Sequence, residues 1–264
     1  MREPGNAIIL LGRLLHNIDK ITEYQLCSIY GGPGGSFTKI ATAEIALPEN
    51  KLPEVEVLIA KTGDEYLSEL IIQDPGVKVS IEPCEKPAIA FTNQTAYKIK
   101  SLLILMCDGV YSRNLEFPDT AEATAAVTLV ERRGDKIFLL YAVRSLLSSK
   151  KSFMYDKIKL TCDILGIETT LVRSVPAWRT TINEDMKALL KDVYPDRPPI
   201  LCKGTMECGI FYENLPKDVA ILALGVPFFL PHSPTEYILL STTKLFYARL
   251  KEFIAKVDWK HITN

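Results

Sequence analysis

Apolar residues near the start of the chain recur at the spacing of one helix face. They lie three or four positions apart, at Ile8, Leu11, Leu15 and Ile18. Pro4 and Asn6 stand just ahead of them, and both residue types are favoured where helices begin. The pattern predicts an amphipathic helix that starts close to Asn6.

Alternation of apolar and polar residues predicts strands along much of the chain after this helix. The clearest pair covers residues 121–132 and 136–145, joined by Arg133, Gly134 and Asp135, a tight-turn signal. The glycine-rich stretch 31–36 is typical of a flexible loop, and the segments on either side of it predict a hairpin. The further predicted strands cover residues 23–30, 39–47, 77–83 and 167–174.

Helical periodicity predicts three more helices between these strands. They cover residues 54–72, 95–106 and 152–165, and Gly166 is placed to end the last one as a C-cap. Helices combined with hairpin-linked strands indicate an α+β domain in which helices lie against a mainly antiparallel sheet.

The pattern changes near residue 180, where we expect a boundary between a domain over residues 1–180 and a segment over 181–264. Asn183 can cap a helix that starts at Glu184. Short apolar stretches at 200–204 and 219–225 then alternate with helical stretches, the last over 242–257, which predicts a small α/β segment with parallel strands. About 85 residues are few for an independent domain of this kind, so we expect the segment to belong to something larger.

Composition excludes several classes of function. Net charge is -1, with 47% hydrophobic and 24% charged residues, which gives no general attraction to nucleic acid or anionic lipid. The longest apolar runs, such as residues 101–107, are far shorter than the roughly 20 residues that cross a bilayer. With no secretory cleavage pattern near the start, we expect a cytoplasmic protein that binds neither nucleic acid nor membrane.

The six cysteines include no C-x-x-C pair, so we expect reduced thiols rather than a disulfide framework or a thiolate zinc site. A cysteine-protease site at Cys202 or Cys208 would need His232 as its partner and has no evident residue to orient it. The glycines of 31–36 lack the Gly-Lys-Ser/Thr ending of a phosphate-binding loop and lead into a strand.

Of the three histidines, His16 and His261 fit the surfaces of amphipathic helices. His232 lies between Pro231 and Pro234, with Glu236 four positions after it. A neutral imidazole is a common zinc ligand, and the prolines would fix its direction. From the residues alone, His232 could be a metal ligand, an acid-base residue or a loop side chain.

Several motifs occur in the order found in one enzyme family. Residues 203–216 (KGTMECGIFYENLP) and 225–236 (GVPFFLPHSPTE) resemble the C-terminal signature of aminoacyl-histidine dipeptidases, the carnosinase-like branch of the di-zinc metallopeptidases. The upstream motifs that resemble the same family, in order, are NAIILLGRLL (6–15), CDGVYSR (107–113), AEAT (121–124), YAVRS (141–145) and VPAW (175–178). The resemblance covers nearly the whole chain and implies that residues 1–180 are a lid domain of the dimerising type. It implies that residues 181–264 are the C-terminal part of a split catalytic domain.

This resemblance also implies roles for three residues. His232 takes the position of the last metal ligand, with Zn as the cofactor. Arg144 takes the position of a lid arginine that binds the carboxylate of a dipeptide substrate; alternatively, it is a strand-end residue that faces water. Glu207, in the MECG motif, is a candidate substrate-binding residue; alternatively, it only begins a helix, where a carboxylate is favoured.

The chain departs from the family at several positions. Lys203 stands where the family has a histidine. Ser36 and Ile40 stand at about the positions where the family has a substrate-binding asparagine and arginine. Thr235 replaces a family aspartate, while Glu236 is kept. The H-x-D pair and the Glu-Glu pair of the family's N-terminal metal-binding half do not occur in these 264 residues. Two-metal hydrolysis needs several such ligands to hold ions about 3.5–4 Å apart.

We therefore expect a truncated or degenerate dipeptidase that binds zinc weakly and is inactive as this chain alone. Its expected partners are a dipeptide and either a second copy or an N-terminal half chain. The alternative is a non-catalytic interaction or dimerisation module derived from the same family.

Overall fold

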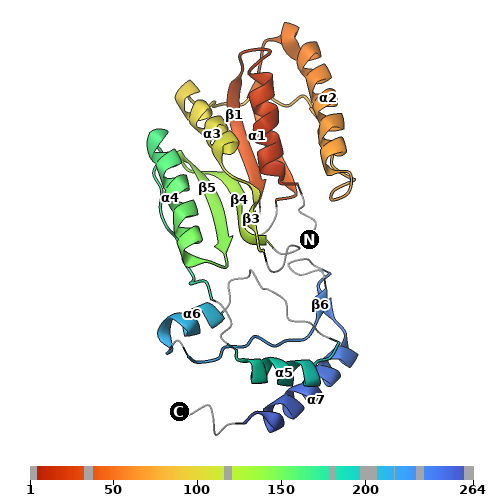
Figure 1. Ribbon diagram of the computed structural model, residues 1–264. Coiled ribbons are helices and arrows are strands. Elements are labelled where there is room, and N and C mark those ends of the chain that lie inside the picture. The colour runs from red at the N-terminus through yellow and green to blue at the C-terminus, as the bar shows by residue number, and fades with distance from the viewer. Residues whose placement is uncertain are drawn as a thin grey trace. The chain divides into compact units, whose positions relative to one another are not determined.

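The computed structural model describes residues 5–32, 38–115, 121–178, 182–196, 207–216, 218–229 and 235–258. The chain divides into two compact units, Met1–Val172 and Arg173–Asn264 (Figure 1). Each unit has its own helices and strands, and each has its own buried apolar cluster.

The first unit contains a five-stranded sheet in which each pairing is antiparallel. Its strands are β1 (Gln25–Gly32), β2 (Ile40–Ala46), β3 (Gly109–Arg113), β4 (Ala121–Arg133) and β5 (Lys136–Ser145). The order is β2-β1-β4-β3. In addition, β5 pairs with β4 along most of the length of β4, on the edge opposite β1 and β3. The expected α/β class with a mainly antiparallel sheet is therefore confirmed, and Gly134, at φ 62°, makes the predicted turn between β4 and β5.

Four α-helices lie in the described part of this unit, and the sequence predicts all of them to within a few residues. They are α1 (Ala7–Ile18), α2 (Leu52–Leu70, after a short 3-10 turn), α3 (Asn93–Leu105) and α4 (Ser148–Ile164). Asn6 begins α1 as predicted, because its side-chain oxygen accepts a hydrogen bond from the backbone N–H of Ile8 at 3.1 Å. Gly166 follows α4 with φ 63°, the left-handed conformation expected after a helix C-terminus.

The helices α1, α3 and α4 pack on one face of the sheet (Figure 1). The main buried cluster joins α1 and α3 to β1 and β4, through Ile8, Leu15, Leu26, Ile29, Ala96, Ile99, Leu103, Val127 and Val130. A close approach of α1 to α3 depends on Gly12, because a Cβ there would lie 2.6 Å from the Cβ of Leu103. A second cluster, Leu14, Ile18, Val55 and Ile59, joins α1 to α2.

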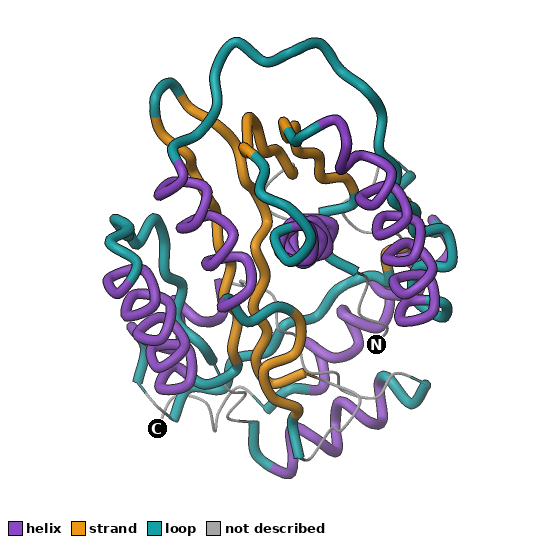
Figure 2. Tube along the Cα trace, turned by 90° about the horizontal axis from the view of Figure 1, so that it is seen from above, coloured by secondary structure: helices purple, strands orange, loops and turns teal. Residues whose placement is uncertain are grey.

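Two predicted strands of the first unit are wrong. Residues 77–83 form no strand but belong to the long connection between α2 and α3, which arches past the strands in Figure 2. Val79 and Ile81 pack on the α1–α2 cluster. The alternating pattern therefore identified correctly which side chains point inward, but the segment is not part of the sheet. Residues 167–174 also form no strand; they cross the division between the two units at Val172.

The second unit contains α5 (Glu184–Val193), α6 (Glu207–Asn214) and α7 (Leu240–Lys256), with a short antiparallel pair, β6 (Phe228–Phe229) and β7 (Tyr237–Ile238). Asn183 caps α5 as predicted, and its side chain accepts from the N–H of Met186 at 2.9 Å. Parallel pairing is not found among the described residues, and 219–225 forms no strand. The predicted stretch 200–204 lies outside the described residues.

Candidate functional site

Arg144 is the penultimate residue of β5 and lies opposite Thr124 of β4. Its neighbours Tyr141 and Val143 pack beneath α4, so strand alternation places Arg144 on the other face of the sheet. The side chain is exposed and forms no ion pair within the described part of the chain. An unpaired guanidinium at a strand end is available to bind a carboxylate in a bidentate manner.

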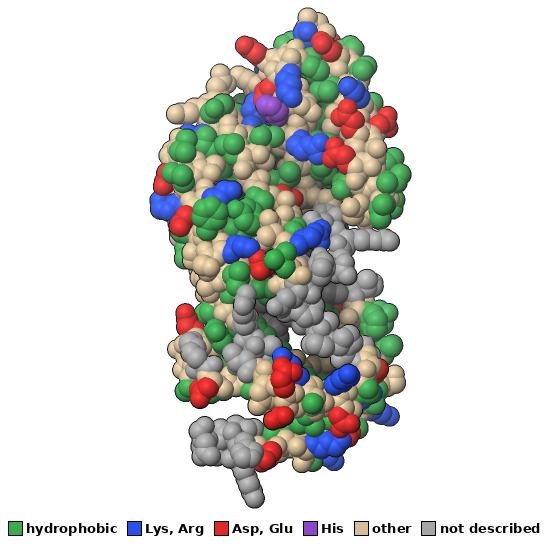
Figure 3. Space-filling model, viewed as in Figure 1, with side chains coloured by type: hydrophobic (Ala, Val, Ile, Leu, Met, Phe, Trp, Pro, Cys, Tyr) green, Lys and Arg blue, Asp and Glu red, His purple; other side chains and the backbone are tan. Residues whose placement is uncertain are grey.

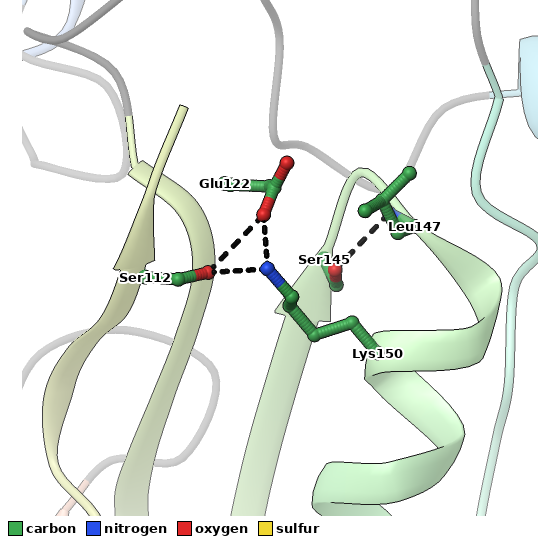
Figure 4. Close-up of polar contacts among 5 residues, drawn as sticks. All are labelled: Ser112, Glu122, Ser145, Leu147 and Lys150. Carbon is green, nitrogen blue, oxygen red and sulfur yellow. Dashed lines mark hydrogen bonds and ion pairs between the residues drawn. The ribbon is translucent and has the colours of Figure 1, made fainter. Parts of the chain in front are cut away.

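A cluster of polar side chains connects the elements around this end of β5 (Figure 4). Lys150, in the first turn of α4, forms an ion pair with Glu122 of β4, and its Nζ donates to Ser112 Oγ of β3 at 3.1 Å. Ser145 Oγ accepts from the N–H of Leu147 at 3.1 Å. The contacts join β3, β4 and β5 to α4 at the end of β5 where Arg144 lies.

Two other groups, one in β5 and one in the connection between α3 and β3, are poor candidates for nucleophiles. Burial raises the pKa of Tyr141, whose hydroxyl donates to the carbonyl of Cys107. Burial also raises the pKa of the Cys107 thiol, which disfavours the reactive thiolate. The chemistry that this region can support is therefore anion binding at Arg144.

Glu207 is the first residue of α6 in the second unit. It is exposed, whereas the next two residues, Cys208 and Gly209, are buried. A Cβ at Gly209 would lie 2.1 Å from the carbonyl oxygen of Pro176, so α6 meets the 175–178 segment directly. A carboxylate at a helix N-terminus is favoured by the helix dipole, so the helix-start alternative accounts for this position without a ligand.

The comparisons with known proteins find dipeptidases. No protein-family model matches the chain. The cytosol non-specific dipeptidase of Escherichia coli (strain K12) is 21% identical over 262 residues, which cover 97% of this chain and 54% of that protein. The crystal structure of aminoacylhistidine dipeptidase from Vibrio alginolyticus matches with a TM-score of 0.79 and 21% identity, over 95% of this chain and 52% of that one.

This chain is related to the dipeptidases. The resemblance seen in the sequence is thereby confirmed, and the fold is that of an aminoacylhistidine dipeptidase over nearly all of this chain. The chain spans about half the length of the dipeptidases it matches.

The metal-ligand position that the resemblance implies does not lie among the residues that the structure describes. His232 and Lys203 lie outside them, as do Ser36 and His261. Within the described ranges, no group of three or more His, Cys, Asp or Glu residues could hold a metal ion. These residues therefore do not fit a zinc site on their own.

The structure describes several other positions that the sequence analysis singled out. Ile40 begins β2 and is 68% exposed, whereas Thr235 and Glu236 are exposed just before β7. His16 is exposed on α1, as predicted. The five cysteines in the described segments are free, and no helix there is long and apolar enough to cross a membrane.

Sequence reasoning missed the cluster of Ser112, Glu122 and Lys150. Lys150 is 28 positions from Glu122 and 38 from Ser112, so no local spacing relates them. The only sequence signal is that Ser112 and Glu122 lie in motifs that resemble the dipeptidase family. Acidic and basic side chains are otherwise interspersed over the surface shown in Figure 3, as the near-zero net charge predicts.

Proposed function

We propose that residues 1–180 correspond to the lid and residues 181–264 to the C-terminal catalytic segment of a zinc-dependent dipeptidase, and that they do not hydrolyse peptides alone. The match covers nearly all of this chain but only about half of each relative, and these residues contain neither an H-x-D nor a Glu-Glu pair. That combination is the observation that carries the proposal. The protein is cytoplasmic, as the description of the Escherichia coli relative suggests.

In this proposal, Arg144 binds the carboxylate of a dipeptide. Its exposure and its lack of an ion pair in the described part of the chain support the role, because its donors are not already engaged. Glu207 contributes a further polar contact to the substrate, and His232 contributes one metal ligand. Zinc, when bound, would polarise the peptide carbonyl and activate water.

A second candidate is a non-catalytic interaction or dimerisation module. Ile40 favours it, because an apolar side chain, 68% exposed, stands near the expected position of a substrate-binding arginine. In addition, β2 is an edge strand that pairs with β1 alone among the described strands, and exposed edges are common sites of association. Lys203, in place of a histidine, would repel a cation rather than bind it.

Zinc content and peptide hydrolysis test the proposal directly. The purified chain is expected to hold less than one equivalent of zinc and to leave aminoacyl-histidine dipeptides intact. The same assay is repeated with a supplied polypeptide that carries the H-x-D and Glu-Glu ligands. Recovery of hydrolysis, and its loss in the H232A variant, would support the peptidase proposal.

Two results would contradict it. Stoichiometric zinc together with dipeptide hydrolysis by these residues alone would overturn the predicted inactivity. A stable self-associated state, with no hydrolysis under any complementation, would favour the interaction module instead; analytical ultracentrifugation measures that state.

A further inference from the structure

A cavity of about 660 Å³, wide open to solvent, lies in the first unit. It is bounded by the first turns of α3, the paired ends of β1 and β2, and the connection that precedes α3. Its volume falls within the range of roughly 300–1,000 Å³ that is usual for small-molecule sites. Neither Arg144 nor Glu207 lines it.

One wall of the cavity is held in place by an ion pair that lies over an aromatic ring. The amine of Lys100, whose side chain is 16% exposed, lies 2.5 Å from Asp19 Oδ1 and 4.7 Å from the centre of the Tyr24 ring. The Tyr24 hydroxyl donates to the carbonyl of Leu15 at 3.0 Å, and burial raises its pKa. Because these side chains fix one another, this wall is formed before any ligand arrives.

The remaining charged groups of the cavity have opposite signs. Glu23 follows the C-terminal end of α1, four positions after Asp19, whereas Lys86 comes from the connection that leads to α3. Both side chains are exposed, and neither forms an ion pair with another described residue. A ligand with a cationic end and an anionic end could therefore pair with both.

Tyr97 adds an aromatic ring to the lining of the cavity. It lies one turn before Lys100 on α3, lines the same cavity and is 65% exposed. An exposed aromatic ring in a cavity is well suited to a flat or apolar side chain of a ligand. Two carboxylates, two amines and two tyrosine rings thus line one space.

We propose that this cavity binds a zwitterionic amino acid or short peptide. The α-ammonium group pairs with Glu23, the α-carboxylate pairs with Lys86, and the ligand side chain packs on Tyr97. This site is independent of the proposed peptidase function, because it uses none of Arg144, Glu207 or His232.

Titration of the ¹⁵N-labelled chain tests the ligand chemistry. The probes are L-alanyl-L-phenylalanine, its N-acetyl and C-amide analogues, and free L-phenylalanine. The zwitterionic peptide or amino acid should shift the amide signals of Gln25, Asn93 and Tyr97, and each blocked analogue should bind about fivefold more weakly, as expected for one exposed ion pair. Comparison of the affinities of the dipeptide and the free amino acid shows which of these two ligands the cavity prefers.

Variants test the residues. E23Q and K86M should each weaken binding about fivefold, whereas E65Q and K61M, which change the same residue types on α2 outside the cavity, should not. R144A should also leave this binding intact, which separates the cavity from the proposed peptidase site. Thermal unfolding confirms that each variant is folded.

Three outcomes would overturn the proposal. They are an absence of shifts at millimolar zwitterion, equal affinity for the blocked analogues, and equal affinity of E23Q and K86M with the parent chain. Binding that is lost in R144A but kept in E23Q and K86M would assign the ligand to Arg144 and would overturn the proposal as well.

Discussion

Lys150 forms an ion pair with Glu122 although the two residues belong to different elements, the first turn of α4 and the start of β4. The side chain of Glu122 is only 14% exposed and that of Lys150 is 28% exposed, so solvent screens the pair less than an ordinary surface ion pair. Leu146 also donates from its N–H to the carbonyl of Glu122 at 2.9 Å.

K150M should lower the free energy of unfolding by about 2 kcal/mol, because it removes the cation that pairs with the largely buried Glu122 carboxylate. K150R, which keeps a cation, should recover part of the loss. Urea unfolding of the first unit measures the effect. K159M is the matched control, since Lys159 pairs with Asp163 on the exposed surface and should change stability by less than about 0.5 kcal/mol. Equal losses of unfolding free energy in K150M and K159M would show that the buried pair stabilises the fold no more than an exposed pair does.

Two glycines in helices should respond in opposite directions to alanine. At Gly12 the new Cβ would lie 2.6 Å from Leu103 Cβ, an atom fixed to the backbone of α3, so G12A should destabilise by about 1–3 kcal/mol despite the better helix propensity of alanine. At Gly63 of α2 the nearest atom would be Val79 Cβ at 3.8 Å. G63A should therefore stabilise by up to about 1 kcal/mol. Thermal unfolding compares them, and a stable G12A would mean that α1 and α3 can separate at little cost.

The ion pair between α1 and α2 should give a measurable pH dependence. Arg13 donates to both carboxylate oxygens of Glu69 at 2.7 Å, and these hydrogen bonds lower the pKa of Glu69 from its usual 4.5. Because the folded pKa is lowered, the stabilisation is present above the unfolded pKa and is lost as the pH falls through the folded value. Both side chains are well exposed, so the contribution should be about 0.5 kcal/mol.

Urea midpoints at pH 7 and pH 3 check this sign. E69Q should be less stable than the parent at pH 7, and the difference should shrink at pH 3. E65Q on the same helix serves as the control. A difference that stays constant or grows as the pH falls would contradict the assignment.

Sequence patterns captured the parts of this fold that depend on local chemistry. The apolar face of α1, the Asn6 and Asn183 caps, and the turns at Gly134 and Gly166 all follow from residues within a few positions of one another. The predictions that failed depended on distant partners. Val79 and Ile81 alternate like a strand, but they pack on helices, and no neighbouring sequence signals that choice.

The candidate site shows the same division. Motif order identified Arg144 as a candidate, and the structure shows it exposed at a strand end; its role stays a prediction. The contacts of Ser112, Glu122 and Lys150 around that end come from three separate elements, so they required the fold. In the same way, Lys100 meets Asp19 and Tyr24 only because α3 packs beside α1.

Arg144 allows a role in ligand binding to be separated from a role in stability. Its side chain is exposed and has no ion pair within the described residues, so R144A should change the free energy of unfolding by less than about 0.5 kcal/mol. If Arg144 binds the substrate carboxylate, R144A should raise KM for a dipeptide by roughly tenfold or more in the complemented enzyme, since a charged hydrogen bond is lost. R144K should recover only part of this, because an ammonium cannot form the bidentate contact. K136A, at the other end of β5, should change neither quantity. A rise in KM that also appears with the dipeptide amide, which lacks the carboxylate, would show that Arg144 acts on something other than that group.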